Sequence, residues 1–199
     1  MKKDILMPIG AILLAALILF GLCFGLQGTA AKNAQEAHLQ LMKTLLPDST
    51  SFTVEPYSGE DANIRSVHKG ENGFVVETVT YGYAGEITMY VGVSNAGKVT
   101  GLVVWDAHET RGLGNRALTD HVFLAQFLNK TGSFAVATQG ADAFSGATGD
   151  TAAAEGESVD VDGITGATVT SKAVVRCVNS AVAYVTGADA ASSATTWGG

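Results

Sequence analysis

The residue types best suited to chemistry lie in segment 162–171, which reads Asp-Gly-Ile-Thr-Gly-Ala-Thr-Val-Thr-Ser. Apolar residues recur at steps of three and four over 172–185, which predicts a helix directly after it. Gly166 and Ala167 leave room for a ligand to approach the backbone. The unpaired N–H groups and positive dipole end of a helix N-terminus suit a phosphate. The hydroxyl of Thr168 is therefore expected where a phosphate would be held.

Segment 162–171 resembles the flavinylation motif of the FMN-binding domain family. This domain occurs in the G subunit of the Rnf electron-transport complex and in the C subunit of the sodium-pumping NADH:quinone oxidoreductase. The resemblance implies a domain that carries FMN, linked covalently through its phosphate to Thr168. It also implies a dedicated flavin transferase as a maturation partner. The remaining cofactor contacts implied in this segment are Thr165, Gly166, Ala167, Thr170 and Ser171.

Asp162, which opens the motif, poses an electrostatic problem. A carboxylate beside a phosphate repels it. Two other tasks suit it better. Its side chain can cap the turn before Thr165 through backbone N–H groups, or the flavin transferase can recognise it.

A second segment, 142–148, has the same skeleton, Asp-Ala-Phe-Ser-Gly-Ala-Thr. No amphipathic pattern follows Thr148, and no Lys or Arg occurs between Lys130 and Lys172. These features predict a flexible acidic insert over 140–158. Thr168 is therefore favoured over Thr148 as the attachment site.

A glycine-containing loop, 109–114, follows a predicted strand and resembles the family's Glu-Thr-Pro-Gly-Leu-Gly pattern, with Arg111 in place of proline. The resemblance places this loop near the flavin. Its glycines let backbone N–H groups face a ring or a phosphate at close range. Arg111 either neutralises a phosphate or is solvated. The simpler alternative for the loop is a turn into the next helix. The candidate contacts are Glu109, Thr110, Gly112, Leu113 and Gly114.

The elements that must position these residues are hairpins and helices without a βαβ repeat, which favours an α+β domain with antiparallel hairpins and flanking helices. A turn rich in Gly and Asn separates the strands of each predicted hairpin. One helix should end at Pro47. The predicted strands are 51–57, 64–68, 74–81, 86–93, 99–106 and 133–138, and the predicted helices are 33–46, 118–128 and 172–185.

The N-terminal region carries no charge between Asp4 and Lys32, and 5–26 is almost wholly apolar. As a helix, this run spans roughly 30 Å, about one hydrocarbon core. Lys2 and Lys3 precede it, which favours a cytoplasmic N-terminus and an extracytoplasmic domain. A cleavable signal peptide is the alternative, but the run is long for one. We expect a transmembrane anchor at 1–29, a helical stalk at 30–50, an extracytoplasmic FMN-binding domain at 51–187 and a disordered tail at 188–199.

The composition excludes several function classes. The net charge of −7 argues against nucleic acid as a partner. Cys23 and Cys177 should not meet, and the histidines show no metal-ligand spacing. No nucleophile–base set is visible, so the chain alone is not expected to turn over a substrate. We expect an electron-carrying component of a Rnf-type ion-translocating complex, in contact with other membrane subunits. The alternatives are a stand-alone extracytoplasmic FMN carrier and a cofactor-free, anchored surface or pilin-like protein.

Overall fold

The computed structural model describes residues 16–17, 20–21, 32–137 and 158–187 of the 199-residue chain. The chain divides into two compact units, Met1–Leu41 and Met42–Gly199. A helix runs over 32–45, which confirms the helix predicted before Pro47. Among the described residues, no helix combines the length and apolar character needed to cross a membrane. Thr148, most of the predicted anchor and insert, and the tail at 188–199 lie outside the described residues.

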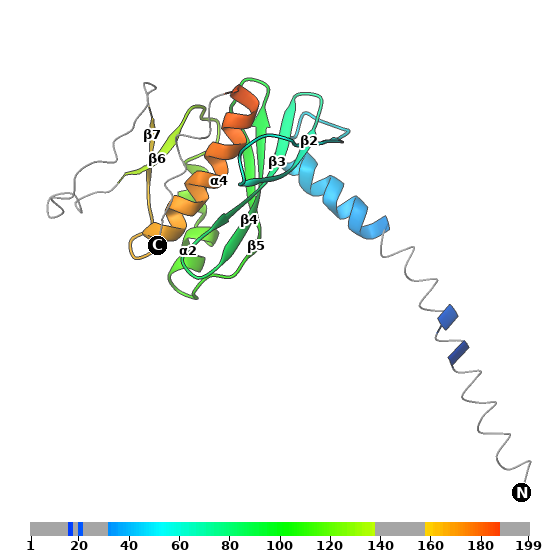
Figure 1. Cartoon of the computed structure of the whole chain (residues 1–199), viewed down its shortest axis with the longest axis horizontal. Coiled ribbons are helices and arrows are strands. Elements are labelled where there is room, and N and C mark those ends of the chain that lie inside the picture. Colours follow the sequence, from blue (N-terminus) through cyan, green and yellow to red (C-terminus); the bar gives the residue numbers. More distant parts are fainter. Residues whose placement is uncertain (1–15, 18–19, 22–31, 138–157, 188–199) are drawn as a thin grey trace, which may run out of the picture. The chain divides into compact units, whose positions relative to one another are not determined.

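A five-stranded antiparallel sheet forms the centre of the second unit, and its strands follow one another in chain order (Figure 1). Both predicted hairpins are confirmed to within a residue or two at each end. Gly97 takes the positive φ of 75° that the turn between the last two strands requires. The strands are β1 (Thr53–Glu55), β2 (Ile64–Lys69), β3 (Gly73–Tyr81), β4 (Glu86–Ser94) and β5 (Val99–Ala107).

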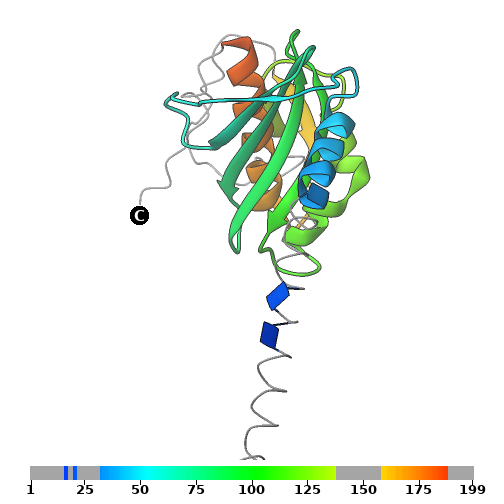
Figure 2. The ribbon, with the colours of Figure 1, turned by 90° about the vertical axis from the view of Figure 1, so that its right-hand side faces the viewer.

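Helix α4 (Thr168–Thr186) lies across one face of this sheet, as both views of the ribbon show (Figures 1 and 2). The Thr80 hydroxyl of β3 donates to the Ala173 carbonyl at 3.3 Å and lies beside the Cys177 sulfur. Cys177 is a free cysteine and fully buried, as its place on the apolar stripe of the helix predicts. The main core therefore lies between α4 and the sheet.

The opposite face of the sheet contacts Leu45. Gly92 and Gly101 pair across β4 and β5, and the Leu45 backbone lies directly against both. A Cβ at Gly101 would come within 3.0 Å of the Leu45 Cα. The Thr100 hydroxyl donates to the Leu45 carbonyl at 2.5 Å. Glycine at these two strand positions thus allows two backbones to approach closely.

The prediction of one continuous helix over 118–128 is wrong. Two short helices, α2 (Gly114–Thr119) and α3 (His121–Ala125), occupy this region instead. Asp120 breaks the run with an extended backbone at ψ 106°. Its carboxylate accepts the N–H groups of Val122 at 2.9 Å and Phe123 at 3.1 Å. An aspartate at such a position caps a new helix more favourably than it continues an old one.

A second, two-stranded sheet lies beside α4, and the sequence predicted only one of its two strands. β6 (Phe134–Ala137) confirms the short strand predicted there. Its partner, β7 (Val159–Asp162), was not predicted, and the two strands run parallel. β7 leads directly into the segment that precedes α4. The Asn179 side chain of α4 bonds both backbone groups of Phe134, at 2.8 and 2.9 Å, and so joins the small sheet to the helix.

Candidate functional site: a pocket at the start of the last helix

The flavinylation-like segment forms a tight turn that ends at the first residue of α4. Gly166 has φ 81°, a conformation that favours glycine. The Ala167 N–H donates to the Ile164 carbonyl at 2.9 Å and closes the turn. The helix then starts at Thr168, earlier than the apolar pattern alone predicts, and Ala167 gives it no side-chain cap. The first N–H groups of α4 are therefore left to bind a ligand or water.

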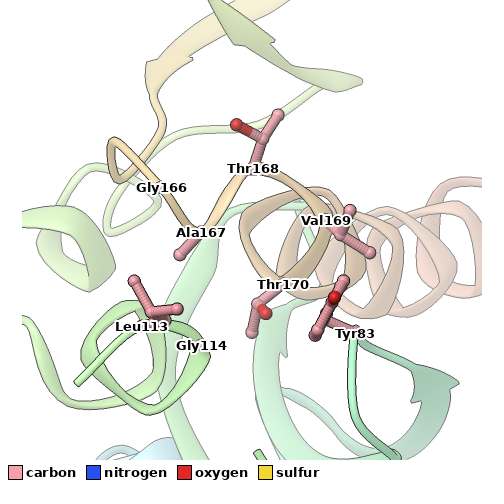
Figure 3. A pocket seen from close by; sticks show the side chains of 8 residues that line it. All are labelled: Tyr83, Leu113, Gly114, Gly166, Ala167, Thr168, Val169 and Thr170. Carbon is pink, nitrogen blue, oxygen red and sulfur yellow. The ribbon is translucent and has the colours of Figure 1, made fainter. Parts of the chain in front are cut away.

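A pocket of about 380 Å³ opens at this helix N-terminus (Figure 3). Three apolar side chains at its edge are well exposed: Tyr83 at 74%, Leu113 at 52% and Val169 at 48%. They belong to the β3–β4 turn, to the loop before α2 and to the first turn of α4. Large apolar side chains this exposed around one pocket indicate a binding surface. The lining residues are Tyr83, Leu113, Gly114, Gly166, Ala167, Thr168, Val169 and Thr170.

The structure brings six of the eleven candidate contact residues to this pocket, from both predicted segments. They are Gly166, Ala167, Thr168, Thr170, Leu113 and Gly114. The other five do not line it. Thr165, Thr110 and Gly112 are exposed nearby, whereas Glu109 is half-buried and Ser171 is fully buried.

The Ser171 side chain has a structural position rather than a pocket-facing one. Its hydroxyl accepts the Ile164 N–H at 3.1 Å. Ser171 thereby performs the turn-capping task that Asp162 was one candidate for. Asp162 is exposed at the end of β7, and its backbone N–H and carbonyl bond to the Gln126 side chain at 2.8 and 3.2 Å. An exposed carboxylate at the first position of the motif is accessible to another protein.

Glu109 connects the loop to the neighbouring hairpin. Its Oε1 accepts the N–H groups of Tyr83 at 2.7 Å and Ala84 at 3.4 Å. This contact holds the β3–β4 turn beside α4 and so brings Tyr83 to the pocket. The other oxygen, Oε2, is buried and has no hydrogen-bond partner among the described residues.

The two loop glycines meet different requirements. Gly112 has φ 81° and open space around it, so its backbone conformation calls for glycine. Gly114 is buried at the start of α2, and a Cβ there would collide with Glu109 and come within 2.8 Å of the Thr170 Oγ1. Gly112 shapes the loop, whereas Gly114 allows the side chains of Glu109 and Thr170 to pack against the loop backbone. Arg111 is exposed between Thr110 and Gly112.

Sequence reasoning missed two of the lining residues, Tyr83 and Val169. Val169 lies inside the predicted motif. The helix predicted from the apolar pattern began only at residue 172, so the pattern did not indicate which way the Val169 side chain points. Tyr83 follows the end of β3 in a turn flanked by Gly82 and Gly85. An aromatic residue in so tight a turn is poorly placed for a core, and this was the available signal.

The arrangement suits an elongated ligand that is apolar at one end and anionic at the other. The free N–H groups and dipole of α4 attract an anion at Thr168. Lys172, exposed one turn later, lies on the same helix face and adds positive charge. No cluster of side chains suited to a metal ion occurs in the part of the chain that the structure describes.

The fold and the pocket define a small α+β domain with a site suited to a ligand of this kind. The chain belongs to the FMN-binding domain family, whose sequence model matches residues 82–183. This match spans the β3–β4 turn, the loop at 109–114 and most of α4, which are the three segments that form the pocket.

Three relatives carry names of ion-translocating complexes. The G subunit of the Na⁺-translocating ferredoxin:NAD⁺ oxidoreductase complex of Acetobacterium woodii is 36% identical over 55% of this chain, but this covers only 47% of that protein, about half its length. The G subunit of the ion-translocating oxidoreductase complex of Methanosarcina acetivorans is 31% identical over 75% of this chain and 76% of that protein. The G subunit of the proton-translocating ferredoxin:NAD⁺ oxidoreductase complex of Clostridium ljungdahlii is 30% identical over 79% of this chain and 76% of that protein.

The crystal structure of Shewanella oneidensis NqrC is a more distant neighbour. It is 23% identical over 63% of this chain and 61% of that chain, with a TM-score of 0.43. A likeness at this level supports no functional argument.

FMN fits the residues present. The pocket volume of about 380 Å³ is in the range of small-molecule sites. Its exposed apolar edge suits an aromatic ring, and the start of α4 suits a phosphate. In addition, the fully buried Thr170 hydroxyl, a pocket-lining group, has no protein partner among the described residues. Such a group is costly to leave unsatisfied and fits a bound polar ligand.

Proposed function

We propose that this chain is a membrane-anchored, FMN-carrying subunit of a Rnf-type ion-translocating oxidoreductase, with FMN joined to Thr168 by a phosphoester. One observation carries the proposal most strongly. Thr168 is at once the first residue of α4, exposed to solvent, and part of the lining of an apolar pocket. A phosphate attached there meets the helix N-terminus, while the ring of the same molecule can reach the pocket.

The chain's own residues bind and orient the cofactor in this proposal. The N–H groups at the start of α4 and the Lys172 ammonium stabilise the phosphate, and Tyr83, Leu113 and Val169 contact the ring. FMN itself supplies the electron-transfer chemistry. Because the pocket edge is open to solvent and apolar, a second redox protein can approach the ring directly.

The partners and the location follow from the relatives and from the charge pattern. Relatives named as the G subunit of ion-translocating complexes support other membrane subunits as partners. The uncharged stretch after Lys2 and Lys3 supports a single-pass anchor at 1–29 with the main domain outside the cytoplasm. The exposed Asp162 supports recognition of the motif by a flavin transferase during maturation.

The covalent linkage is tested by intact-mass and peptide mass spectrometry after expression with a flavin transferase. The mass should rise by one FMN less one water, and the label should lie on the peptide that contains Thr168. The Thr168→Val variant should lose the label, because valine keeps the shape but has no hydroxyl. Thr148→Val is the matched control and should keep it. Label on Thr148, or no label in the wild type, would refute the assignment.

The membrane topology is tested on intact cells and spheroplasts. Protease added outside should digest the domain at 51–187 while cytoplasmic marker proteins survive. Protection of that domain would reverse the proposed orientation. Sequencing the N-terminus of the mature protein tests the anchor separately, because a mature N-terminus near residue 31 would mean that a signal peptide had been removed.

A further inference from the structure

Two buried polar atoms beside the pocket have no protein partner. They are the Glu109 Oε2 and the Thr170 Oγ1, each without a hydrogen bond within the described parts of the chain. Thr170 is fully buried and lines the pocket. Leaving such atoms unsatisfied is unfavourable, so native structures usually pair them with protein, water or ligand.

The two atoms converge on one point, the place where Gly114 has no side chain. A Cβ built at Gly114 would touch the Glu109 Oε2 and would lie 2.8 Å from the Thr170 Oγ1. Gly114 does not have the positive φ that would itself call for glycine. Glycine here therefore lets both hydrogen-bonding groups lie close to the loop backbone, which a side chain would prevent. We call Glu109, Gly114 and Thr170 the polar niche.

The chemistry of the polar niche selects the group that can enter it. An ionised carboxylate only accepts hydrogen bonds, whereas a threonine hydroxyl both donates and accepts. The entering group must therefore be a hydrogen-bond donor. A phosphate is disfavoured because it would face the Glu109 carboxylate at short range. The polar niche thus attracts a hydrogen-bond donor, whereas the start of α4 attracts an anion.

We propose that the polar niche receives a hydrogen-bond donor of the FMN, either an N–H of the ring or a hydroxyl of the ribityl chain. This inference rests on the proposed function. With the phosphate at Thr168 and a donor in the niche, the cofactor is fixed at two points and can enter in one direction only. Glu109 positions two groups. Its Oε1 holds the turn that carries Tyr83, and its Oε2 faces the polar niche and the cofactor group that enters it.

The first test replaces the hydroxyl with a methyl group of the same shape, in Thr170→Val. The FMN-free variant should be at least as stable as the wild type, because an unsatisfied buried hydroxyl is removed. The rise in Tm when FMN is attached should shrink, because a contact to the cofactor is lost. Thr80→Val is the matched control. Its buried hydroxyl already donates to Ala173, so the FMN-free form should lose stability while the rise on attachment stays that of the wild type.

The second test uses Glu109→Gln. Because Glu109 lies outside the flavinylation motif, this variant tests the polar niche even if Thr170→Val prevents attachment of FMN. Glutamine can still accept from Tyr83, but it can present an NH₂ group to the incoming donor. Flavin fluorescence anisotropy should fall in this variant as the cofactor gains mobility. A shift in reduction potential as well identifies the ring N–H as the donor, and an unchanged potential identifies a ribityl hydroxyl.

The outcomes separate this inference from the proposed function. Wild-type protein without the FMN mass refutes the proposed function. Wild-type protein that carries FMN, together with a Glu109→Gln variant of unchanged anisotropy and potential, refutes the polar niche alone. In that case neither atom contacts the cofactor.

Discussion

Tyr83 reaches the pocket through a contact made by a residue far along the chain. Glu109 binds the backbone N–H groups of the β3–β4 turn and so holds the tyrosine beside the first turn of α4. The ring is 74% exposed and does not serve the core. Its position suits contact with an aromatic cofactor, since aromatic rings stack or meet edge to face.

Replacing Tyr83 with leucine should raise the fluorescence of the attached flavin, because a tyrosine in contact with a flavin quenches its excited state by donating an electron. Steady-state and time-resolved fluorescence of the FMN-loaded protein measure the effect. Tyr81→Leu is the control, since Tyr81 is similarly exposed, at 71%, but does not line the pocket. Equal fluorescence in both variants would place the ring away from Tyr83.

The two loop glycines should respond differently to alanine. Gly112→Ala forces a left-handed backbone on a residue with a side chain and should cost about 1–2 kcal/mol of stability. It should leave the flavin spectrum unchanged, because Gly112 has open space around it. Gly114→Ala should change the spectrum, because its methyl group would displace Glu109. Urea unfolding and absorbance spectra of both loaded variants test this, and an altered spectrum in Gly112→Ala would contradict it.

At the scale of elements, the region between β5 and β6 shows how one residue divides a helix. Asp120 stands where an apolar helical pattern continues on both sides, yet its carboxylate bonds two N–H groups that follow it. α2 therefore ends at Thr119 and α3 starts at His121. After the break, Phe123 and Phe127 pack against each other in the core, with ring centroids 5.5 Å apart.

Asp120→Ala should lower the free energy of unfolding by about 1 kcal/mol, the usual effect of removing a helix N-cap. Asp160→Ala, an exposed position on β7, serves as the control and should change stability much less. Urea unfolding followed by circular dichroism compares the two. Equal losses would mean that the cap contributes nothing beyond general surface charge.

At the scale of the whole molecule, the core between the sheet and α4 buries an ionisable group. Cys177 is fully enclosed, and burial raises the pKa of its thiol from the ordinary value of 9.0. In the unfolded chain the same thiol titrates normally. Above that value the unfolded state loses a proton that the folded state keeps, so stability must fall as the pH rises.

The free energy of unfolding should therefore decline as the pH rises past 9.0, by at most about 1.4 kcal/mol per pH unit from this group. Burial also raises the pKa of Tyr90 and of Tyr184 from 10.0, and both add to the decline at higher pH. Cys177→Ala should show a shallower decline, because only the tyrosine contribution remains. Urea unfolding at a series of pH values gives both slopes. Identical slopes would show that the thiol is accessible to water in the folded protein.

The sequence by itself determined the local elements and the chemistry of the attachment segment. Period-two patterns and Gly- or Asn-containing turns identified both hairpins, because alternation and turn residues act over a few neighbours. The small-residue segment before an apolar helix placed Thr168 at a helix N-terminus for the same reason. These features depend on interactions between residues close together in the chain, and such interactions are visible in one dimension.

Only the tertiary structure decided which residues meet at the pocket. Tyr83, Gly114 and Thr170 come from three elements, and packing of α4 on the sheet brings them together. The parallel pairing of β6 with β7 and the division at Asp120 also depend on distant partners. The unpartnered atoms of Glu109 and Thr170 can be recognised only in the folded chain, because the lack of a partner depends on all the groups that surround an atom.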